Sequence, residues 1–133
     1  MSGRKKLSVF IIDDNESTRA VLRMIIHGEV YEVIGDAANG TSGLERTLKL
    51  RPDIVCLDVV MPDMDGLDVL VQIKQALPKT MVLMVSASND AETVKNAITH
   101  GASGFIIKPF NTGTVLDTLE KNAAKLDLKS SPS

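Results

Sequence analysis

The stretch IVCLDVVMPDMDG, residues 54–66, decides the fold of this chain. It opens with four apolar residues, Ile54 to Leu57, and Pro52 stands just upstream of them. Such a short apolar run is typical of a strand that is buried on both faces. Pro62 and Gly66 then predict a loop. Apolar residues at helical spacing follow, at positions 67, 70, 71 and 73. The segment therefore predicts a strand, a loop and a helix, which together form the repeating unit of an α/β domain.

The same unit recurs along the whole chain. Strands are expected at 7–12, 30–34, 54–57, 81–85 and 105–107, with a helix after each. This alternation predicts an α/β fold: a five-stranded parallel sheet with five helices that cover both of its faces. The strand at 30–34 is the most polar and is expected near an edge. A strand order of 2-1-3-4-5, common in doubly wound sheets, would make the first and third strands neighbours.

The composition excludes several classes of protein. The chain has 133 residues, of which 44% are hydrophobic, so it can bury one substantial core and is not expected to be disordered. A formal net charge of −2 predicts no broad basic face, and we expect no direct binding of nucleic acid. The apolar runs are far shorter than the ~20 residues that cross a bilayer, and no signal peptide is evident, so a cytoplasmic protein is expected. Cys56 is the single cysteine, which rules out an internal disulfide.

Polar residues stand where the predicted strands end. Asp13 and Asp14 follow the first strand, Asp58 the third, Ser86 the fourth and Lys108 the fifth. Because ligands bind outside the carboxyl ends of parallel strands, these five side chains are expected to share one site. Three carboxylates carry a charge of −3, which one lysine and one divalent cation would balance, and oxygen ligands of this kind suit Mg²⁺. Taken singly, Asp13 or Asp14 could equally cap the following helix.

With these residues in place, the chain resembles the receiver domain of two-component response regulators, and it is similar to the single-domain chemotaxis type. The resemblance rests on FIIDDNEST (10–18), IVCLDVVMPDMDG (54–66), MVLMVSAS (81–88) and GASGFIIKPF (101–110), and it covers roughly Lys6 to Leu126. It implies a flavodoxin-like receiver domain over residues 7–126. Residues 1–6 would form an N-terminal extension, and residues 127–133 a disordered tail.

The resemblance also implies a role for each residue of the site. Asp58 would be the phosphoacceptor, and Mg²⁺ would be held by Asp13, Asp14, Asp58 and the backbone carbonyl of Val60. Lys108 would contact a phosphoryl oxygen, and the bond between Lys108 and Pro109 would be cis. Such a domain phosphorylates and dephosphorylates itself, and it is not a turnover enzyme. Val60 has no polar side chain that could hydrogen-bond an attacking water, which leads to the hypothesis that the domain loses its phosphoryl group slowly.

The resemblance further implies a switch and two partners. Ser86 and Phe105 would be the switch residues, although a serine at a strand end and a phenylalanine in a core are also ordinary features. The phosphoryl donor would be a histidine kinase or a histidine phosphotransfer protein. An unknown downstream protein would bind the face formed by the fourth helix, the fifth strand and the fifth helix.

Two other functions fit parts of the pattern. A Mg²⁺-dependent phosphatase of the haloacid-dehalogenase type also uses a strand-end aspartate, but it requires a second aspartate two residues later, where this chain has Asn15. A flavodoxin-like electron carrier would share the fold. With 3% aromatic residues and no Trp, however, the chain offers little surface on which a flavin could stack.

Overall fold

The computed structural model describes residues 6–130, in which five strands alternate with five helices. The strands are β1 (Leu7–Ile12), β2 (Tyr31–Ala37), β3 (Ile54–Asp58), β4 (Met81–Ser86) and β5 (Gly104–Ile107). The helices are α1 (Glu16–Ile26), α2 (Gly40–Leu50), α3 (Gly66–Ala76), α4 (Ala91–Thr99) and α5 (Thr112–Ser130). All strand pairs are parallel, and the strands lie in the order β2-β1-β3-β4-β5. The predicted fold class and strand order are therefore confirmed.

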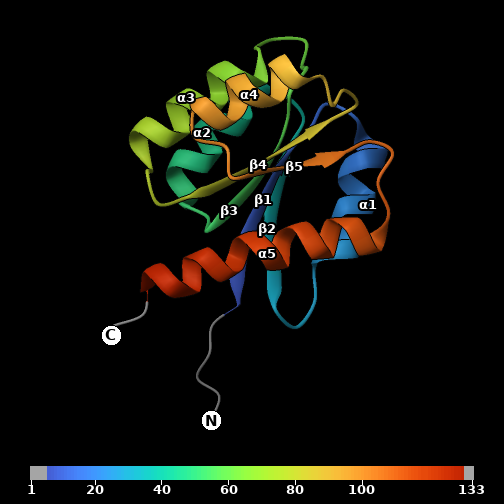
Figure 1. Cartoon of the computed structure of the whole chain (residues 1–133), viewed down its shortest axis with the longest axis vertical. Helices are drawn as coiled ribbons and strands as arrows, with labels where there is room; N and C mark the ends of the chain where they lie inside the picture. The colour runs from blue at the N-terminus through green and yellow to red at the C-terminus, as the bar shows by residue number, and fades with distance from the viewer. Residues whose placement is uncertain (1–5, 131–133) are drawn as a thin grey trace.

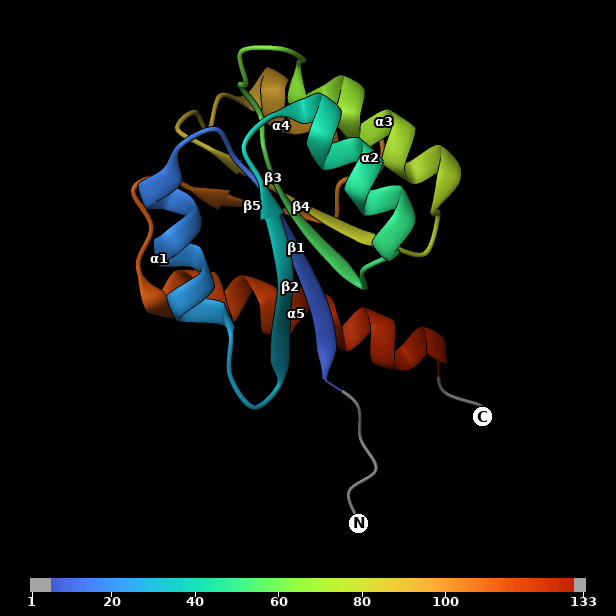
Figure 2. The ribbon, with the colours of Figure 1, turned by 180° about the vertical axis from the view of Figure 1, so that it is seen from behind.

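Helices cover both faces of the sheet. Figure 1 shows α2, α3 and α4 on one side and α1 and α5 on the other, and Figure 2 shows the same layers from behind. Each side has its own buried cluster. The first includes Leu22 and Ile26 of α1 with Leu119 of α5, and the second includes Leu70 and Ile73 of α3. β3 contributes to both clusters because its side chains alternate between the two faces and all five of its residues are buried.

The helices begin at side chains that accept hydrogen bonds from their first turns. Asn15, Asn39, Asp65 and Asp90 cap α1, α2, α3 and α4 in this way. Asn15 accepts from the amide of Thr18, so neither Asp13 nor Asp14 is the cap of α1. That leaves both carboxylates available to a site at the end of β1.

Two predicted boundaries were wrong by more than one residue. β2 runs from Tyr31 to Ala37 and not from 30 to 34, because Gly35 and Asp36 continue its pairing with β1 after an irregularity in register. α5 extends to Ser130, so residues 127–130 are helical and do not belong to a disordered tail. The sequence contains neither Gly nor Pro from Thr114 to Ser131, which favours the longer helix. Residues 1–5 and 131–133 of the predicted extension and tail lie outside the described residues.

None of the helices in the described part of the chain combines the length and the hydropathy that a membrane crossing requires.

Candidate functional site

Asp13 and Asp14 leave the end of β1 with different degrees of exposure. Asp13 is 1% exposed, whereas Asp14 is exposed to solvent. The Asp13 amide donates to the carbonyl of Ala37 at 3.1 Å, which continues the pairing of β1 with β2. Its carboxylate Oδ1 accepts the amide of Asn15 at 2.9 Å. The buried carboxylate is therefore held in place by main-chain contacts before any ligand binds.

Asp58 ends β3 and is 5% exposed. Its Oδ1 accepts the amide of Val60 at 3.4 Å. The turn behind it is tight: a Cβ atom on Gly66 would lie 2.2 Å from the carbonyl oxygen of Asp58, so only glycine fits there. Burial first, and then repulsion by Asp13, raise the pKa of Asp58 to about 6, against the opposing effects of Lys108 and the Val60 amide.

Lys108 brings its ammonium group between two of the carboxylates. Its Nζ lies 3.2 Å from Oδ2 of Asp13 and 3.6 Å from Oδ1 of Asp58. Its amide donates to the carbonyl of Ser86 at 2.8 Å, which ties the end of β5 to the end of β4. The bond from Lys108 to Pro109 is cis, as predicted. The lysine therefore faces the carboxylates while its backbone is fixed to the neighbouring strand.

The three aspartates have the chemistry of a Mg²⁺ site. One oxygen from each of Asp13, Asp14 and Asp58 lies within 4.8 Å of the others. Oδ2 of Asp13 is buried and receives no hydrogen bond from the described residues, although Lys108 Nζ is near it. Three carboxylates and one ammonium leave a charge of −2, and repulsion by Asp13 adds to the effect of burial in raising the pKa of Asp58. A divalent cation with oxygen ligands fits both the charge and the unused oxygen.

The two predicted switch residues lie in different surroundings. Ser86 lines the same pocket as Asp14, Asp58 and Lys108. Its hydroxyl donates to the carbonyl of Ser88 at 3.0 Å and accepts the amide of Ser88 at 3.0 Å. Phe105 does not line this pocket, but packs partly buried against the cluster under α2, α3 and α4. Ser86 thus belongs to the site itself, and Phe105 to the wall of the core.

Val60 lies at the mouth of the pocket with 75% of its surface exposed. It forms an antiparallel bridge with Asp65 across the β3–α3 loop. Its side chain offers no polar atom to the site. Coordination by its backbone carbonyl stays a prediction.

Sequence reasoning missed two residues that support the site. Arg19 of α1 donates from Nη1 to the carbonyl of Asp13 at 2.8 Å. Asp63, in the loop after Asp58, accepts hydrogen bonds from the amides of Gly40 and Thr41 at the start of α2. Neither contact has a signal in the spacing of the sequence, because the first depends on how α1 packs beside the end of β1 and the second joins segments that only the fold brings together.

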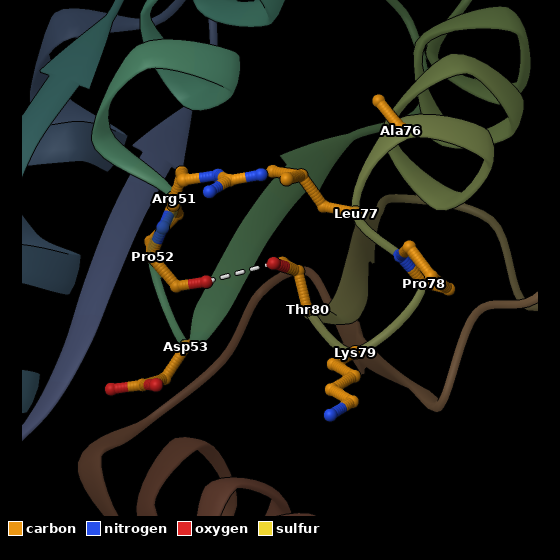
Figure 3. A pocket seen from close by; sticks show the side chains of 8 residues that line it. All are labelled: Arg51, Pro52, Asp53, Ala76, Leu77, Pro78, Lys79 and Thr80. Atoms are coloured by element: carbon orange, nitrogen blue, oxygen red, sulfur yellow. Dashed lines mark hydrogen bonds between the residues drawn. The ribbon is translucent and has the colours of Figure 1, made fainter.

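A second pocket lies at the opposite end of the sheet, before β3 and β4 begin. Figure 3 shows its lining, with the hydroxyl of Thr80 donating to the carbonyl of Pro52 at 2.9 Å. Its one carboxylate, Asp53, accepts hydrogen bonds from the amide and hydroxyl of Ser8. This pocket has no cluster of acidic groups, so the chemistry is concentrated at the carboxyl ends of the strands.

Comparison with known proteins gives consistent matches. A family model described as the response regulator receiver domain matches residues 9–120. The chemotaxis protein CheY of Listeria monocytogenes is 40% identical over 117 residues, which are 88% of this chain and 98% of that protein. A chain of the CheX–CheY–BeF3–Mg complex from Borrelia burgdorferi is 32% identical with a TM-score of 0.83, over 86% of this chain and 87% of that one. The response regulator domain of Thermotoga maritima CheB is 30% identical with a TM-score of 0.80, over 90% of this chain and 96% of that one. These matches give no support to the haloacid-dehalogenase alternative.

Proposed function

This chain belongs to the family of response regulator receiver domains, and we propose that it is a phosphorylation-activated switch in which Asp58 accepts the phosphoryl group. Members of this family are signalling switches of two-component systems and not turnover enzymes. The observation that carries the proposal is the position of the Asp58 carboxylate. It is buried at the end of β3, beside Asp13 and Lys108, and lines a pocket that opens to solvent.

In the proposed reaction a carboxylate oxygen of Asp58 attacks the phosphorus of a phosphohistidine. A new O–P bond forms while the N–P bond to the imidazole breaks, so that the histidine leaves with the electron pair of that bond. The donor is a histidine kinase or a histidine phosphotransfer protein, and a small acyl phosphate can replace it. Lys108, 3.6 Å from Asp58, is placed to neutralise charge on the transferred oxygens. Its positive charge also lowers the pKa of Asp58 and so favours the nucleophilic carboxylate.

The residues that would hold Mg²⁺ are Asp13, Asp14, Asp58 and the backbone carbonyl of Val60. When bound, the ion would supply two positive charges that neutralise the phosphoryl oxygens. Asp13 is buried and fixed by the amide of Asn15, so it contributes a preoriented carboxylate. Asp14 is exposed and keeps its carboxylate at the open side of the site.

We further propose that Ser86 and the face formed by α4, β5 and α5 carry the signal. To bind a phosphoryl oxygen, the Ser86 hydroxyl must stop donating to the carbonyl of Ser88, which would release the loop before α4. α4 is lightly anchored: Ala97 is its buried residue, and Ile98 is 48% exposed. Ile107 on the neighbouring edge strand is 37% exposed. These apolar side chains support a downstream protein as the partner of this face.

The test of the proposed function is intact mass after incubation with acetyl phosphate and Mg²⁺. We expect one phosphoryl group on the parent protein and none on Asp58→Asn or after chelation of the metal. Asp68→Asn is the matched control, because it removes an exposed carboxylate of α3 and should be labelled like the parent. Equal labelling of Asp58→Asn would disprove the assignment of the phosphoacceptor. A parent that takes up no phosphoryl group and binds no beryllofluoride with Mg²⁺ would overturn the function.

A further inference from the structure

We propose that Arg19 is a positioning residue of the acidic site: anchored on Asp36 at the edge of the sheet, it fixes the peptide between Asp13 and Asp14 for Mg²⁺ binding. This inference rests on the proposed function, because it concerns the same metal site. It adds a residue from α1 and an anchor on β2, two elements that contribute no group to the expected Mg²⁺ ligands.

The guanidinium group of Arg19 is held at two points. Nη1 donates to the carbonyl oxygen of Asp13 at 2.8 Å, and Nε lies 3.4 Å from Oδ1 of Asp36. The side chain is 16% exposed, so these contacts are largely shielded from water. A planar guanidinium that is bound through two different nitrogens has little freedom to rotate. It can therefore impose a direction on the carbonyl that it contacts.

The anchor is itself fixed. Asp36 lies in β2 and is paired with Ile11 of β1. Its second carboxylate oxygen accepts Nη2 of Arg23 at 2.9 Å, and its carbonyl accepts Nη1 of Arg46. The guanidinium of Arg46 in turn stacks over the buried ring of Phe10, 5.2 Å from its centroid. Arg19 is thus attached to a part of the sheet that several independent contacts hold in place.

The carbonyl of Asp13 belongs to the peptide that joins the two acidic residues. The amide of Asp13 is bound by Ala37 and its carboxylate by Asn15, so the Arg19 contact fixes a third group of the same residue. Together the three contacts set the orientation of the peptide plane from which Asp14 follows. Because Asp14 is exposed, the direction of its carboxylate depends on this backbone. Partners that orient metal ligands in this way typically contribute 10- to 100-fold to metal affinity.

Whether replacing Arg19 weakens or strengthens the binding of Mg²⁺ distinguishes a positioning role from a purely electrostatic one. Arg19 carries a positive charge, and removing a positive charge near three carboxylates should by itself strengthen the binding of a cation. Loss of the Asp13 contact should instead weaken it. Arg23 offers a matched control, because it binds the same Asp36 and carries the same charge but makes no contact with Asp13.

The experiment is calorimetric titration of the full chain with MgCl₂ alone, well below the melting temperature of each variant. We expect Arg19→Gln to bind Mg²⁺ about tenfold more weakly than the parent. Arg23→Gln should bind as tightly as the parent or more tightly. Arg19→Lys keeps the charge but cannot bridge Asp13 and Asp36 with a rigid fork, so its affinity should also fall. This variant serves as the second test where Arg19→Gln folds poorly.

Affinity for Mg²⁺ in Arg19→Gln and Arg19→Lys equal to or above that of the parent would overturn the inference, even if their melting temperatures fall. Equal weakening in Arg23→Gln would also overturn it, because the effect would then belong to the Asp36 network and not to the Asp13 contact. A parent that binds no Mg²⁺ and takes up no phosphoryl group would defeat the proposed function as well. Binding by the parent with unchanged Arg19 variants would defeat this inference alone.

Discussion

At the scale of single residues, two buried threonines are in opposite hydrogen-bonding situations. Oγ1 of Thr47 in α2 is fully buried and has no hydrogen-bond partner among the described residues. Oγ1 of Thr80 donates to the carbonyl of Pro52. A buried hydroxyl without a partner costs desolvation energy that a methyl group does not. We therefore expect Thr47→Val to raise the free energy of unfolding in urea by about 1 kcal/mol.

Thr80→Val is the matched control, because the same change there removes a hydrogen bond and leaves a buried carbonyl without its donor. It should lower the free energy of unfolding by about 1–2 kcal/mol. If Thr47→Val were destabilised as strongly as Thr80→Val, the hydroxyl of Thr47 would have to be satisfied in solution.

We also expect the lifetime of a phosphoryl group on Asp58 to depend on a single side chain, that of Val60. Val60 is exposed at the mouth of the pocket and offers no hydrogen bond to an attacking water. We expect the phosphorylated parent to lose its phosphoryl group slowly and Val60→Asn to lose it severalfold faster, because an amide can orient the water. Intact mass followed over time after removal of the donor measures both rates. Val30→Asn, an exposed position before β2, should behave like the parent. A parent half-life of seconds at neutral pH would contradict the hypothesis.

At the scale of elements, Asp63 ties the loop after Asp58 to the start of α2. Its carboxylate accepts the amides of Gly40 and Thr41 at 2.8 and 2.9 Å and the hydroxyl of Thr41 at 2.7 Å. These donors lower the pKa of Asp63 from its usual 3.8 to about 2, the Thr41 amide contributing most. A carboxyl with a lowered pKa stabilises the fold above its unfolded pKa and loses this contribution as the pH falls through the folded value.

We therefore expect Asp63→Asn to melt at a lower temperature than the parent at pH 5 and above. The difference should shrink as the pH falls from about 4 to about 2, because the parent carboxyl then becomes protonated too. Calorimetric melting across this range measures it. Asp68→Asn removes an equal charge from α3 and should show no comparable loss at pH 5. If Asp63→Asn lowers the melting temperature by the same amount at pH 5 and at pH 2, the hydrogen bonds of the Asp63 carboxylate do not stabilise the fold as proposed.

The sequence predicted the secondary-structure elements well and some of their boundaries poorly. Every element was predicted, because apolar runs alternate with helical periodicity. The predicted ends of elements were less accurate where residues typical of turns continue a strand. Gly35 and Asp36 have the composition of a turn, yet they extend β2 because they pair with β1 and Asp36 binds two arginines. The side chain of Asn111 accepts the amide of Thr114 in the first turn of α5, a contact that the sequence alone does not single out because Thr112 is also a suitable cap.

At the scale of the whole molecule, parallel topology explains why the convergence of the five polar residues was predictable. The carboxyl ends of β1, β3, β4 and β5 lie at the same end of the sheet. Residues at or just after these strand ends therefore converge, whatever the loops between them contain. Asp13, Asp14, Asp58, Ser86 and Lys108 obey this rule. Arg19 and Asp63 do not follow from it, because their contacts depend on how a helix or a loop packs beside another element.

Phe105 provides the last test, because it joins the edge strand to the core on the side of α2, α3 and α4. Its ring packs partly buried against a cluster that includes Ala97 of α4, and Phe105 pairs with Met84 on β4, the strand that ends in Ser86. A phenylalanine leaves no polar group unsatisfied when it turns inward, whereas a tyrosine hydroxyl would need a partner there. We expect the ring of Phe105→Tyr to be more exposed than that of the parent. Selective isotope labelling can follow it, because the chain has three Phe and one Tyr.

A soluble paramagnetic reagent should broaden the signal of the ring at position 105 more strongly in Phe105→Tyr than in the parent, with the fully buried Phe10 as internal reference. Beryllofluoride with Mg²⁺ should reduce this difference if, as proposed, occupation of the site draws the Ser86 hydroxyl away from the Ser88 carbonyl and favours the inward ring. If the ring at position 105 is broadened equally in the parent and in Phe105→Tyr, both with and without beryllofluoride, Phe105 is an ordinary core residue. The effect of phosphorylation would then leave the site by another route.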